Sequence, residues 1–194
     1  MSLIVLMGPQ AVGKMTVGRV LAQKIEGRLL YNHQTLDVFA EMLGYRQAAF
    51  DLSDQLRKML FKAFAEEPEK NPTKHLVFTL VIDFDDKKDW QFLKDIEKIF
   101  VRKKQAVYFI ELESPLAIRL ERNKGADRLA AKPSKRDLIQ SEKELMASHQ
   151  KQRLNSETGE FIKKFPKSPY LKIANGELSP EETVDIILNQ FIFE

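Results

Sequence analysis

The chain has 194 residues, 43% of them hydrophobic, which predicts one domain (residues 1–194) with a single sizeable core. It contains no cysteine, which excludes disulfides and thiolate metal sites, and its three histidines stand too far apart to suggest a zinc site. A net charge of +3 gives no reason to expect nucleic-acid binding. No apolar run is long enough to span a membrane and no basic leader precedes the first strand, so we expect a soluble, cytoplasmic protein.

The first predicted element is a buried strand over residues 3–7, and a run with the spacing of a phosphate-binding loop follows it directly. Gly8 and Gly13 let the backbone turn tightly around an anion, so that its N–H groups point inward while Lys14 reaches the outer phosphates. The helix expected to begin near Lys14 adds the positive end of its dipole. We therefore expect nucleotide contacts from Gly8, Gln10, Ala11, Val12, Gly13, Lys14, Met15 and Thr16.

One position of this loop departs from the common pattern. Met15 follows the lysine, where many such loops place the Ser or Thr hydroxyl that binds magnesium, and Thr16 comes one position later. The metal would then be held through its water shell, with Thr16 and Asp83 as the candidate residues.

The next segments alternate between strands and helices. A short strand at 29–31 leads into a helix that runs to Gly44, and a further helix is predicted over 51–65. The segment 68–72, with a proline at each end, breaks the pattern, and the apolar run 75–82 is typical of a buried parallel strand. The expected apolar face of the helix over 51–65 consists of Leu52, Leu56, Met59, Leu60 and Phe64.

The second half of the chain continues the alternation. Residues 123–136 are polar and basic, which predicts a mobile loop between two helices. The other expected elements are a helix around 90–100, a strand over 106–112, helices over 115–120 and 137–154, a polar connector over 155–169, a strand over 170–173 and a final helix capped by Ser179. This order predicts an α/β fold with a five-stranded parallel sheet flanked by helices, and ligands at the carboxyl ends of the strands.

Polar residues follow two of these strands, where they would meet the phosphate loop along one edge of the sheet. Asp83 comes after the strand 75–82, a position suited to a carboxylate that holds the magnesium shell or accepts the proton of an acceptor hydroxyl. Asp85 is a candidate substrate contact. Acidic residues are also common in the first turn of a helix, so a capping role is the structural alternative for both.

A second polar set follows the strand at 29–31. Asn32, His33 and Asp37 would lie where an acceptor molecule binds beside the phosphate loop, and their side chains can hydrogen-bond a sugar, an acid or a base. The structural alternatives are that Asn32 is a helix N-cap and that Asp37 is a solvated surface charge. After the last strand, Asn175 is a candidate contact to adenine, and its neighbours equally form a plain turn signal.

The basic segment 122–136 has the composition of a lid that closes over phosphates, a role in which arginine is preferred for its planar fork. Arg122 and Arg128 are the expected catalytic arginines. A charged, solvated helix-loop-helix would have the same composition. Further candidates for phosphate contacts are Arg119, Arg136 and Arg153.

The GPQAVGKMT loop, the strand ending in Asp83, the arginine-rich segment 122–136 and the LSPEE-capped final helix together resemble the small P-loop kinases. Shikimate, gluconate and nucleoside monophosphate kinases and chloramphenicol phosphotransferase belong to this group. The loop is similar to the GKGT form of adenylate and cytidylate kinases, which also lack a hydroxyl directly after the lysine. The strings GKMTVG, DFDD and KPSKRDL resemble most closely a set of ATP-binding proteins labelled shikimate-kinase-like. The aspartate pair of the shikimate-binding pattern is replaced here by Asn32, His33 and Asp37, which argues against shikimate itself.

The resemblance implies the P-loop nucleoside triphosphate hydrolase fold, with a helical insertion at about 33–70 for the acceptor and a basic lid at 122–136. It further implies an ATP- and magnesium-dependent transfer of phosphate to a small molecule with a hydroxyl or phosphate group, by a monomer or homodimer. Two alternatives stay open. One is a nucleotide-binding regulatory or chaperone-like module with little catalysis, and the other is a nucleic-acid-end kinase, whose binding would weaken steeply with salt.

Overall fold

The computed structural model describes residues 1–131 and 136–193, without the side chains of residues 127, 128 and 131. Five parallel strands form one sheet in the order β2-β3-β1-β4-β5, as predicted for the α/β class. Their bounds are β1 (Ser2–Met7), β2 (Arg28–Leu30), β3 (His75–Leu80), β4 (Ala106–Glu113) and β5 (Tyr170–Ala174). The central strand β1 pairs with β3 and β4 over its whole length, so that Val5 lies between Phe78 and Phe109.

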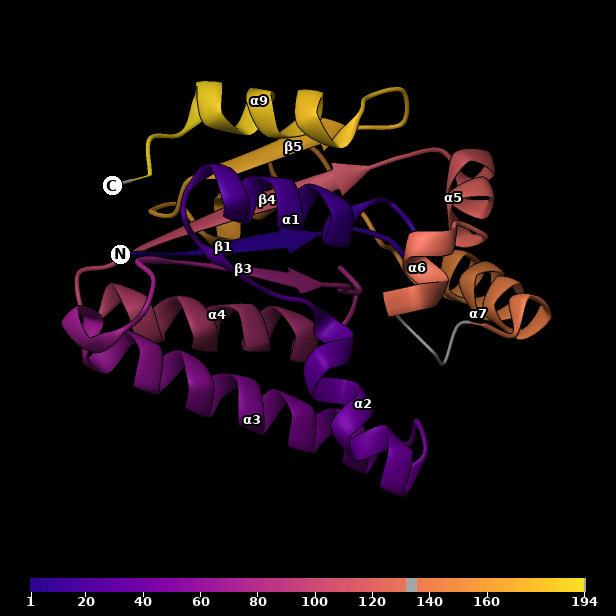
Figure 1. Ribbon diagram of the computed structural model, residues 1–194, viewed down its shortest axis with the longest axis horizontal. Helices are drawn as coiled ribbons and strands as arrows, with labels where there is room; N and C mark the ends of the chain where they lie inside the picture. The colour runs from indigo at the N-terminus through magenta and orange to yellow at the C-terminus, as the bar shows by residue number, and fades with distance from the viewer. Residues whose placement is uncertain (132–135, 194) are drawn as a thin grey trace.

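Helices cover both faces of the sheet (Figure 1). Alternate side chains of β1 point to opposite faces: Ile4 and Leu6 pack under α1 (Lys14–Lys24) and α9 (Pro180–Gln190). Leu3, Val5 and Met7 pack instead with the aromatic core under α3 (Gln47–Glu66), α4 (Lys87–Val101) and α8 (Glu160–Lys164).

The remaining helices gather around the carboxyl ends of the strands, the end to which the arrowheads of Figure 1 point. They are α2 (Asn32–Leu43), α5 (Leu116–Asn123), α6 (Ala126–Ala131) and α7 (Leu138–Lys151). A short 3-10 turn at Pro68–Lys70 lies instead at the other end of the sheet, just before β3. Among the described residues, no helix combines the length and the apolar character needed to cross a membrane.

The predicted apolar face of α3 is wrong except for Phe64, which is buried. Leu52, Leu56, Met59 and Leu60 are 36–67% exposed, and the face that packs inward consists of Ala49, Ser53, Arg57, Phe61, Phe64 and Ala65. Polar groups share the buried face because α2 offers them partners: Thr35 accepts hydrogen bonds from Ser53 Oγ at 2.9 Å and from Arg57 Nε at 2.8 Å. A prediction of the buried face from apolar residues alone cannot identify buried polar residues that are hydrogen-bonded to another helix.

Two segments expected to lack regular structure contain helices. The predicted loop 123–136 includes α6, and the predicted connector 155–169 includes α8, whose Phe161 and the following Phe165 stack on each other with ring centroids 4.8 Å apart. This pair packs on Trp90, which explains why so short a helix is stable.

The beginnings and ends of other elements shift by a few residues. The N-cap of α2 is Tyr31, and Asn32 is the first helical residue, so the predicted capping role of Asn32 is wrong. The side chain of Gln34 accepts a bond from the Tyr31 N–H at 2.8 Å and completes the cap instead. The strand β3 ends at Leu80, opposite Met7 at the end of β1, so two residues of the predicted strand belong to the loop before Asp83.

Candidate functional site

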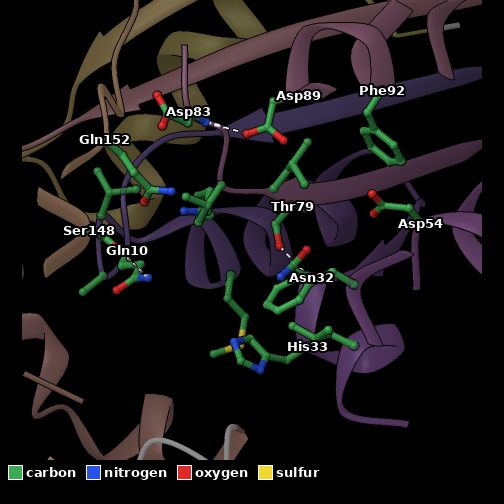
Figure 2. A pocket seen from close by; sticks show the side chains of 18 of the residues that line it. Gln10, Asn32, His33, Asp54, Thr79, Asp83, Asp89, Phe92, Ser148 and Gln152 are labelled. Carbon is green, nitrogen blue, oxygen red and sulfur yellow. Dashed lines mark hydrogen bonds between the residues drawn. The ribbon is translucent and has the colours of Figure 1, made fainter. Parts of the chain in front are cut away.

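A cleft of about 1300 Å³ opens at the carboxyl ends of the strands. Its walls are the phosphate loop, α2, α3, the loop after β3, the start of α4, α5, α7 and the turn after β5 (Figures 1 and 2). The structure therefore brings together segments from both halves of the chain. The predicted site residues that line this cleft are Gln10, Ala11, Val12, Gly13, Lys14, Met15, Thr16, Asn32, His33, Asp83, Arg122 and Asn175.

The phosphate loop owes its shape to three left-handed backbone positions. Gly8 has φ +138°, Ala11 +60° and Gly13 +109°. A Cβ on Gly8 would lie 2.4 Å from the Leu112 carbonyl oxygen of β4, so only glycine fits there. Gly8 itself does not line the cleft and acts by shaping the loop.

The start of α1 is left open toward the cleft. Its N-cap is Gly13, and no side chain of the described residues caps its first N–H groups. Lys14 folds back over the loop and donates from Nζ to the carbonyl oxygens of Gly8 at 2.6 Å and Pro9 at 2.7 Å. Uncapped N–H groups, the helix dipole and an adjacent ammonium together make an anion site suited to phosphates.

Arg122 supports the phosphate loop through its backbone. Its guanidinium donates to the carbonyl oxygens of Val12 at 3.0 Å, Asn175 at 2.9 Å and Gly176 at 2.9 Å. Asn175, which is 2% exposed, donates from Nδ2 to the same Val12 oxygen at 2.9 Å. The two side chains thus join the loop to the turn after β5, which lines the cleft beside it.

Of the other predicted lid arginines, two are engaged with neighbouring groups. Arg119 is 3% exposed behind the loop and contacts the Gln10 carbonyl oxygen at 3.5 Å and His149 Nδ1 at 3.2 Å, and burial lowers the pKa of its guanidinium. Arg136 donates to the Leu129 carbonyl oxygen at 3.3 Å. The side chain of Arg128 lies outside the described residues.

Asp83 lines the cleft after β3, the strand next to the one that leads into the phosphate loop (Figure 2). Its Oδ1 accepts the N–H groups of Asp85 at 3.0 Å and Arg153 at 3.2 Å. Its Oδ2 has no hydrogen bond from any described residue. The carboxylate is thus oriented through one oxygen while the other is free to bind.

Asp89, in the first turn of α4, is a site residue that the sequence reasoning did not identify. It lines the cleft, and its Oδ2 accepts the Asp83 N–H at 2.7 Å (Figure 2). Burial, above all, raises the pKa of Asp89 to about 6, the hydrogen bond from Asp83 opposes this, and the charges of neighbouring aspartates add to it. The sequence indicated only that Asp89 belongs to an acidic first turn of a helix. Acidic residues there are equally expected from their favourable interaction with the helix dipole.

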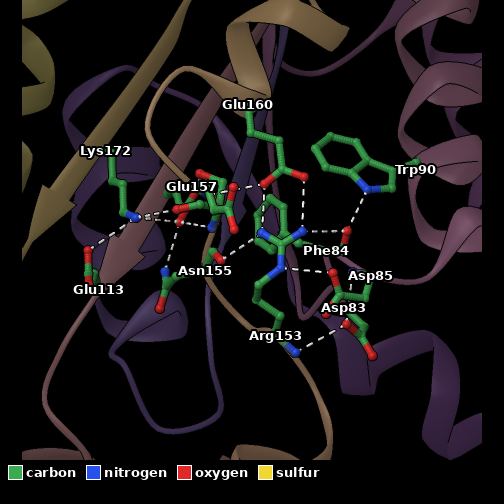
Figure 3. A network of polar contacts seen from close by, with 12 residues as sticks. Asp83, Phe84, Asp85, Trp90, Glu113, Arg153, Asn155, Glu157, Glu160 and Lys172 are labelled. Carbon is green, nitrogen blue, oxygen red and sulfur yellow. Dashed lines mark hydrogen bonds and ion pairs between the residues drawn. The ribbon is translucent and has the colours of Figure 1, made fainter.

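Asp85 is turned away from the cleft, and its predicted contact to substrate finds no support in its position. Its carboxylate is 69% exposed and accepts a bond from Arg153 Nε at 2.9 Å. Arg153 also holds Glu160 through both terminal nitrogens, at 2.6 and 2.9 Å, and the Phe84 carbonyl oxygen at 3.0 Å (Figure 3). Glu160, more than any other group, raises the pKa of Arg153. Arg153 therefore holds the loop after β3 to α8, and its predicted contact to phosphate finds no support in its position outside the cleft lining.

Of the three predicted acceptor residues, Asn32 and His33 line the cleft and Asp37 does not. His33 lines the cleft, and its Nδ1 lies 2.9 Å from Asp37 Oδ1, which also accepts a bond from the Tyr45 hydroxyl at 2.9 Å. Asp37 does not line the cleft and orients the other two residues. The Asn32 N–H donates to Thr79 Oγ1 at 3.2 Å, which fixes the start of α2 to β3 (Figure 2).

Magnesium has possible oxygen ligands at two places on the cleft wall. One is Oδ2 of Asp83. The other is the hydroxyl of Thr16, a half-buried residue at the start of α1 that lines the same cleft. The described residues contain no group of three side chains arranged to hold a metal directly. One carboxylate and one hydroxyl fit a magnesium ion that keeps most of its water shell and is otherwise bound by phosphates.

Comparison with family models and with curated proteins gives no match, whereas the fold matches many solved structures. The APS kinase CysC of Mycobacterium tuberculosis, in complex with AMPPNP and APS, has a TM-score of 0.62 at 13% identity over 97% of this chain and 96% of its own. A shikimate kinase from Acinetobacter baumannii in complex with shikimate has a TM-score of 0.54 at 16% identity, over 97% and 90%. The tunicamycin resistance protein of Deinococcus radiodurans has a TM-score of 0.57 at 16% identity, over 97% and 94%. These matches confirm the expected fold of the small P-loop kinases, and at such identities they show the fold alone.

Proposed function

We propose that the chain is an ATP-dependent phosphotransferase that moves the γ-phosphate to a small molecule with a hydroxyl or phosphate group. The observation that carries this proposal is the shared cleft. It places the phosphate loop, with Lys14, and the free carboxylate oxygen of Asp83 around one space. A module that only binds a nucleotide has no need of a second large compartment beside the phosphates.

Nucleotide binding uses the loop and the turn after β5. The uncapped N–H groups at the start of α1 bind the phosphates, and Lys14 exchanges its two carbonyl partners for the outer phosphates. Arg122 and Asn175 hold the loop against the turn after β5, and we place the base beside that turn. Arg122 then acts through the loop it supports, and the expected lid contact at Arg128 stays a prediction.

Transfer to a hydroxyl acceptor requires positioning and charge neutralisation more than covalent chemistry. The acceptor oxygen forms a bond to the γ-phosphorus while the bond from that phosphorus to the bridging oxygen breaks, and ADP leaves with the electron pair. Asp83 Oδ2 accepts the hydroxyl proton, and Lys14 neutralises the charge on the transferred group. Thr16 and Asp83 would hold a magnesium ion through its water shell, and the bound ion would supply further neutralisation of the phosphates.

The test is magnesium-dependent ATP consumption by the wild type and by Lys14→Ala, with and without a panel of hydroxyl and phosphate acceptors. We expect one acceptor class to stimulate turnover, and Lys14→Ala to lower it by roughly a hundredfold or more. The matched control is Lys24→Ala at the other end of α1, where the ammonium is 39% exposed and pairs with Asp185. This control should retain wild-type turnover.

Two outcomes would contradict the proposal. If ATP binds in a Lys14-dependent manner but no acceptor raises its consumption, the chain is a nucleotide-binding regulatory module instead. If calorimetry detects no ATP binding to the folded protein, both functions are wrong.

A further inference from the structure

The acceptor half of the cleft has its own charge pattern. Its walls are α2, α3 and the first turns of α4, with the loop after β3 between them. Three cationic side chains line it, Arg57, Lys58 and Lys88. Whether this half can bind an anionic acceptor depends on how far these cations are already engaged.

Arg57 is buried and bonded to groups of α2 and α3. It is 4% exposed and uses all three guanidinium nitrogens: Nε bonds Thr35 Oγ1 at 2.8 Å, Nη1 bonds Asp54 Oδ1 at 2.8 Å and Nη2 bonds the Asn32 carbonyl oxygen at 3.0 Å. Three of its five N–H groups are used in these bonds, and its charge is already paired with the Asp54 carboxylate. An acidic group of the acceptor would therefore have to compete with Asp54 for a nearly buried cation.

Lys58 is also paired. Its Nζ lies 2.6 Å from Asp95 Oδ2 and 5.4 Å from the centre of the Phe92 ring. The cleft wall thus already holds one ammonium group between a carboxylate and an aromatic face. Among the described residues that line this half, only Lys88, exposed in the first turn of α4, is a cation without an ion pair.

The carboxylates of the same half are in excess. Asp51 accepts a bond only from Gln47 Nε2 at 2.9 Å, Asp86 caps α4 through the Lys88 N–H at 2.8 Å, and Asp89 accepts the Asp83 N–H. None of the three is paired with a cationic side chain of the described residues. These three carboxylates, beside Asp83 at the reacting end, line the acceptor half of the cleft together with one exposed lysine.

We infer that the acceptor carries a protonated amine and no acidic group, an amine-bearing alcohol such as an amino sugar or aminocyclitol. This inference rests on the proposed phosphotransferase function. The reacting hydroxyl lies toward Asp83, and the ammonium lies toward the carboxylates of α3 and α4. Phe50, 42% exposed on the cleft wall, offers an apolar face for the ring that joins the two groups. Charge complementarity of this kind selects against acids as strongly as it selects for amines.

The test compares acceptors that differ at one group: glucosamine, N-acetylglucosamine, glucose and gluconate, with an aminocyclitol and shikimate beside them. Phosphorylated product is measured with ATP, and binding is measured by calorimetry with a non-hydrolysable ATP analogue. We expect kcat/KM for the best amine to exceed that of its N-acetyl derivative by at least roughly tenfold, with no transfer to the acids.

Two variants locate the effect in the cleft. Asp51→Asn and Asp89→Asn should each lower the preference for the amine over its N-acetyl derivative by roughly threefold or more, and leave the rate with the neutral compound less affected. The matched control is Asp185→Asn on α9, which removes a carboxylate outside the cleft and should leave the preference unchanged.

The outcomes separate this inference from the proposed function. Preferred transfer to gluconate or shikimate, or equal use of the amine and its N-acetyl derivative, overturns the acceptor class and leaves a phosphotransferase. Binding of the amines without any transfer supports the charge assignment and overturns the phosphotransferase. If no amine of the panel binds or reacts at millimolar concentration, the inferred acceptor class is wrong.

Discussion

The two halves of the cleft are built by different means. The nucleotide half is made from backbone: left-handed residues at Gly8, Ala11 and Gly13 shape the loop, and Arg122 holds it by carbonyl oxygens. The acceptor half is made from side chains of three helices: Arg57 joins α3 to α2, and the Lys58–Asp95 ion pair joins α3 to α4. A backbone site fixes where phosphates bind with few alternatives, whereas a side-chain site can change its ligand by single substitutions without loss of the fold. The variants below test this difference.

The largest effect is expected from Gly8→Ala in the phosphate loop. The new Cβ would lie 2.4 Å from the Leu112 oxygen at φ +138°, so the loop must move away from β4. We expect a loss of roughly 3 kcal/mol or more in the free energy of unfolding, with loss of ATP binding. Urea unfolding and calorimetry measure the two effects.

The matched control is Gly159→Ala, at φ +75° with nothing within 4 Å of the added Cβ. It should cost only about 1 to 2 kcal/mol, the price of a left-handed alanine. Equal losses for the two variants would show that the contact with β4 does not fix the loop.

The second effect concerns Arg122→Met, which removes three hydrogen bonds from the loop and the turn after β5. We expect ATP to bind at least roughly tenfold more weakly, because each bond from a charged donor contributes more than about 1 kcal/mol. Arg122→Lys keeps the charge but cannot reach three carbonyl groups, and should restore only part of the affinity. Unchanged ATP affinity in a folded Arg122→Met variant would contradict the backbone account of the nucleotide half.

The same difference explains what the sequence could predict. The strand, loop and helix at residues 2–24 are consecutive, and their chemistry depends on glycine positions and apolar spacing that a sequence displays directly. The alternation of strands and helices likewise predicted the parallel sheet. Asn32, His33 and Asp83 were expected at the edge of the cleft because parallel strands end on one side, and the structure places them there.

The residues that were missed depend on contacts between distant segments. Arg57 is buried only because Thr35 and Asn32 of α2 accept its hydrogen bonds, and nothing near it in the sequence indicates this. Arg153 was assigned to phosphates because its partner Glu160, on a helix that was not predicted, was not visible as a partner. The partner of a charged side chain is set by the tertiary fold and cannot be read from the sequence. The roles of charged residues were therefore the least predictable part of the site.

The third prediction extends the comparison to the loop after β3. Arg153 holds this loop through the Phe84 oxygen and Asp85, and its own N–H bonds Asp83 Oδ1 (Figure 3). We expect Arg153→Met to lower kcat by roughly tenfold, because the loop that carries Asp83 loses the side-chain bonds to Phe84 and Asp85, while ATP affinity stays unchanged. Arg153→Lys should be intermediate, since it keeps the charge and loses the fork. A weakened ATP affinity with unchanged kcat would place Arg153 in the nucleotide half instead.

The smallest effect is a pH dependence of stability at Glu160. The Arg153 side chain lowers the pKa of Glu160 below its ordinary value of 4.5, the Glu157 N–H and the charge of Lys164 act in the same direction, and burial opposes them. A folded-state pKa below the unfolded value means that ionised Glu160 stabilises the fold above the unfolded pKa. That stabilisation is lost as the pH falls through the folded-state pKa. Glu160→Gln should therefore be less stable than the wild type near neutral pH, by no more than about 1 kcal/mol, and equal to it once the pH lies below the folded-state pKa of Glu160. Urea unfolding of both proteins across this range measures the difference, and a difference that does not change with pH would show that Glu160 acts by packing and not by its charge.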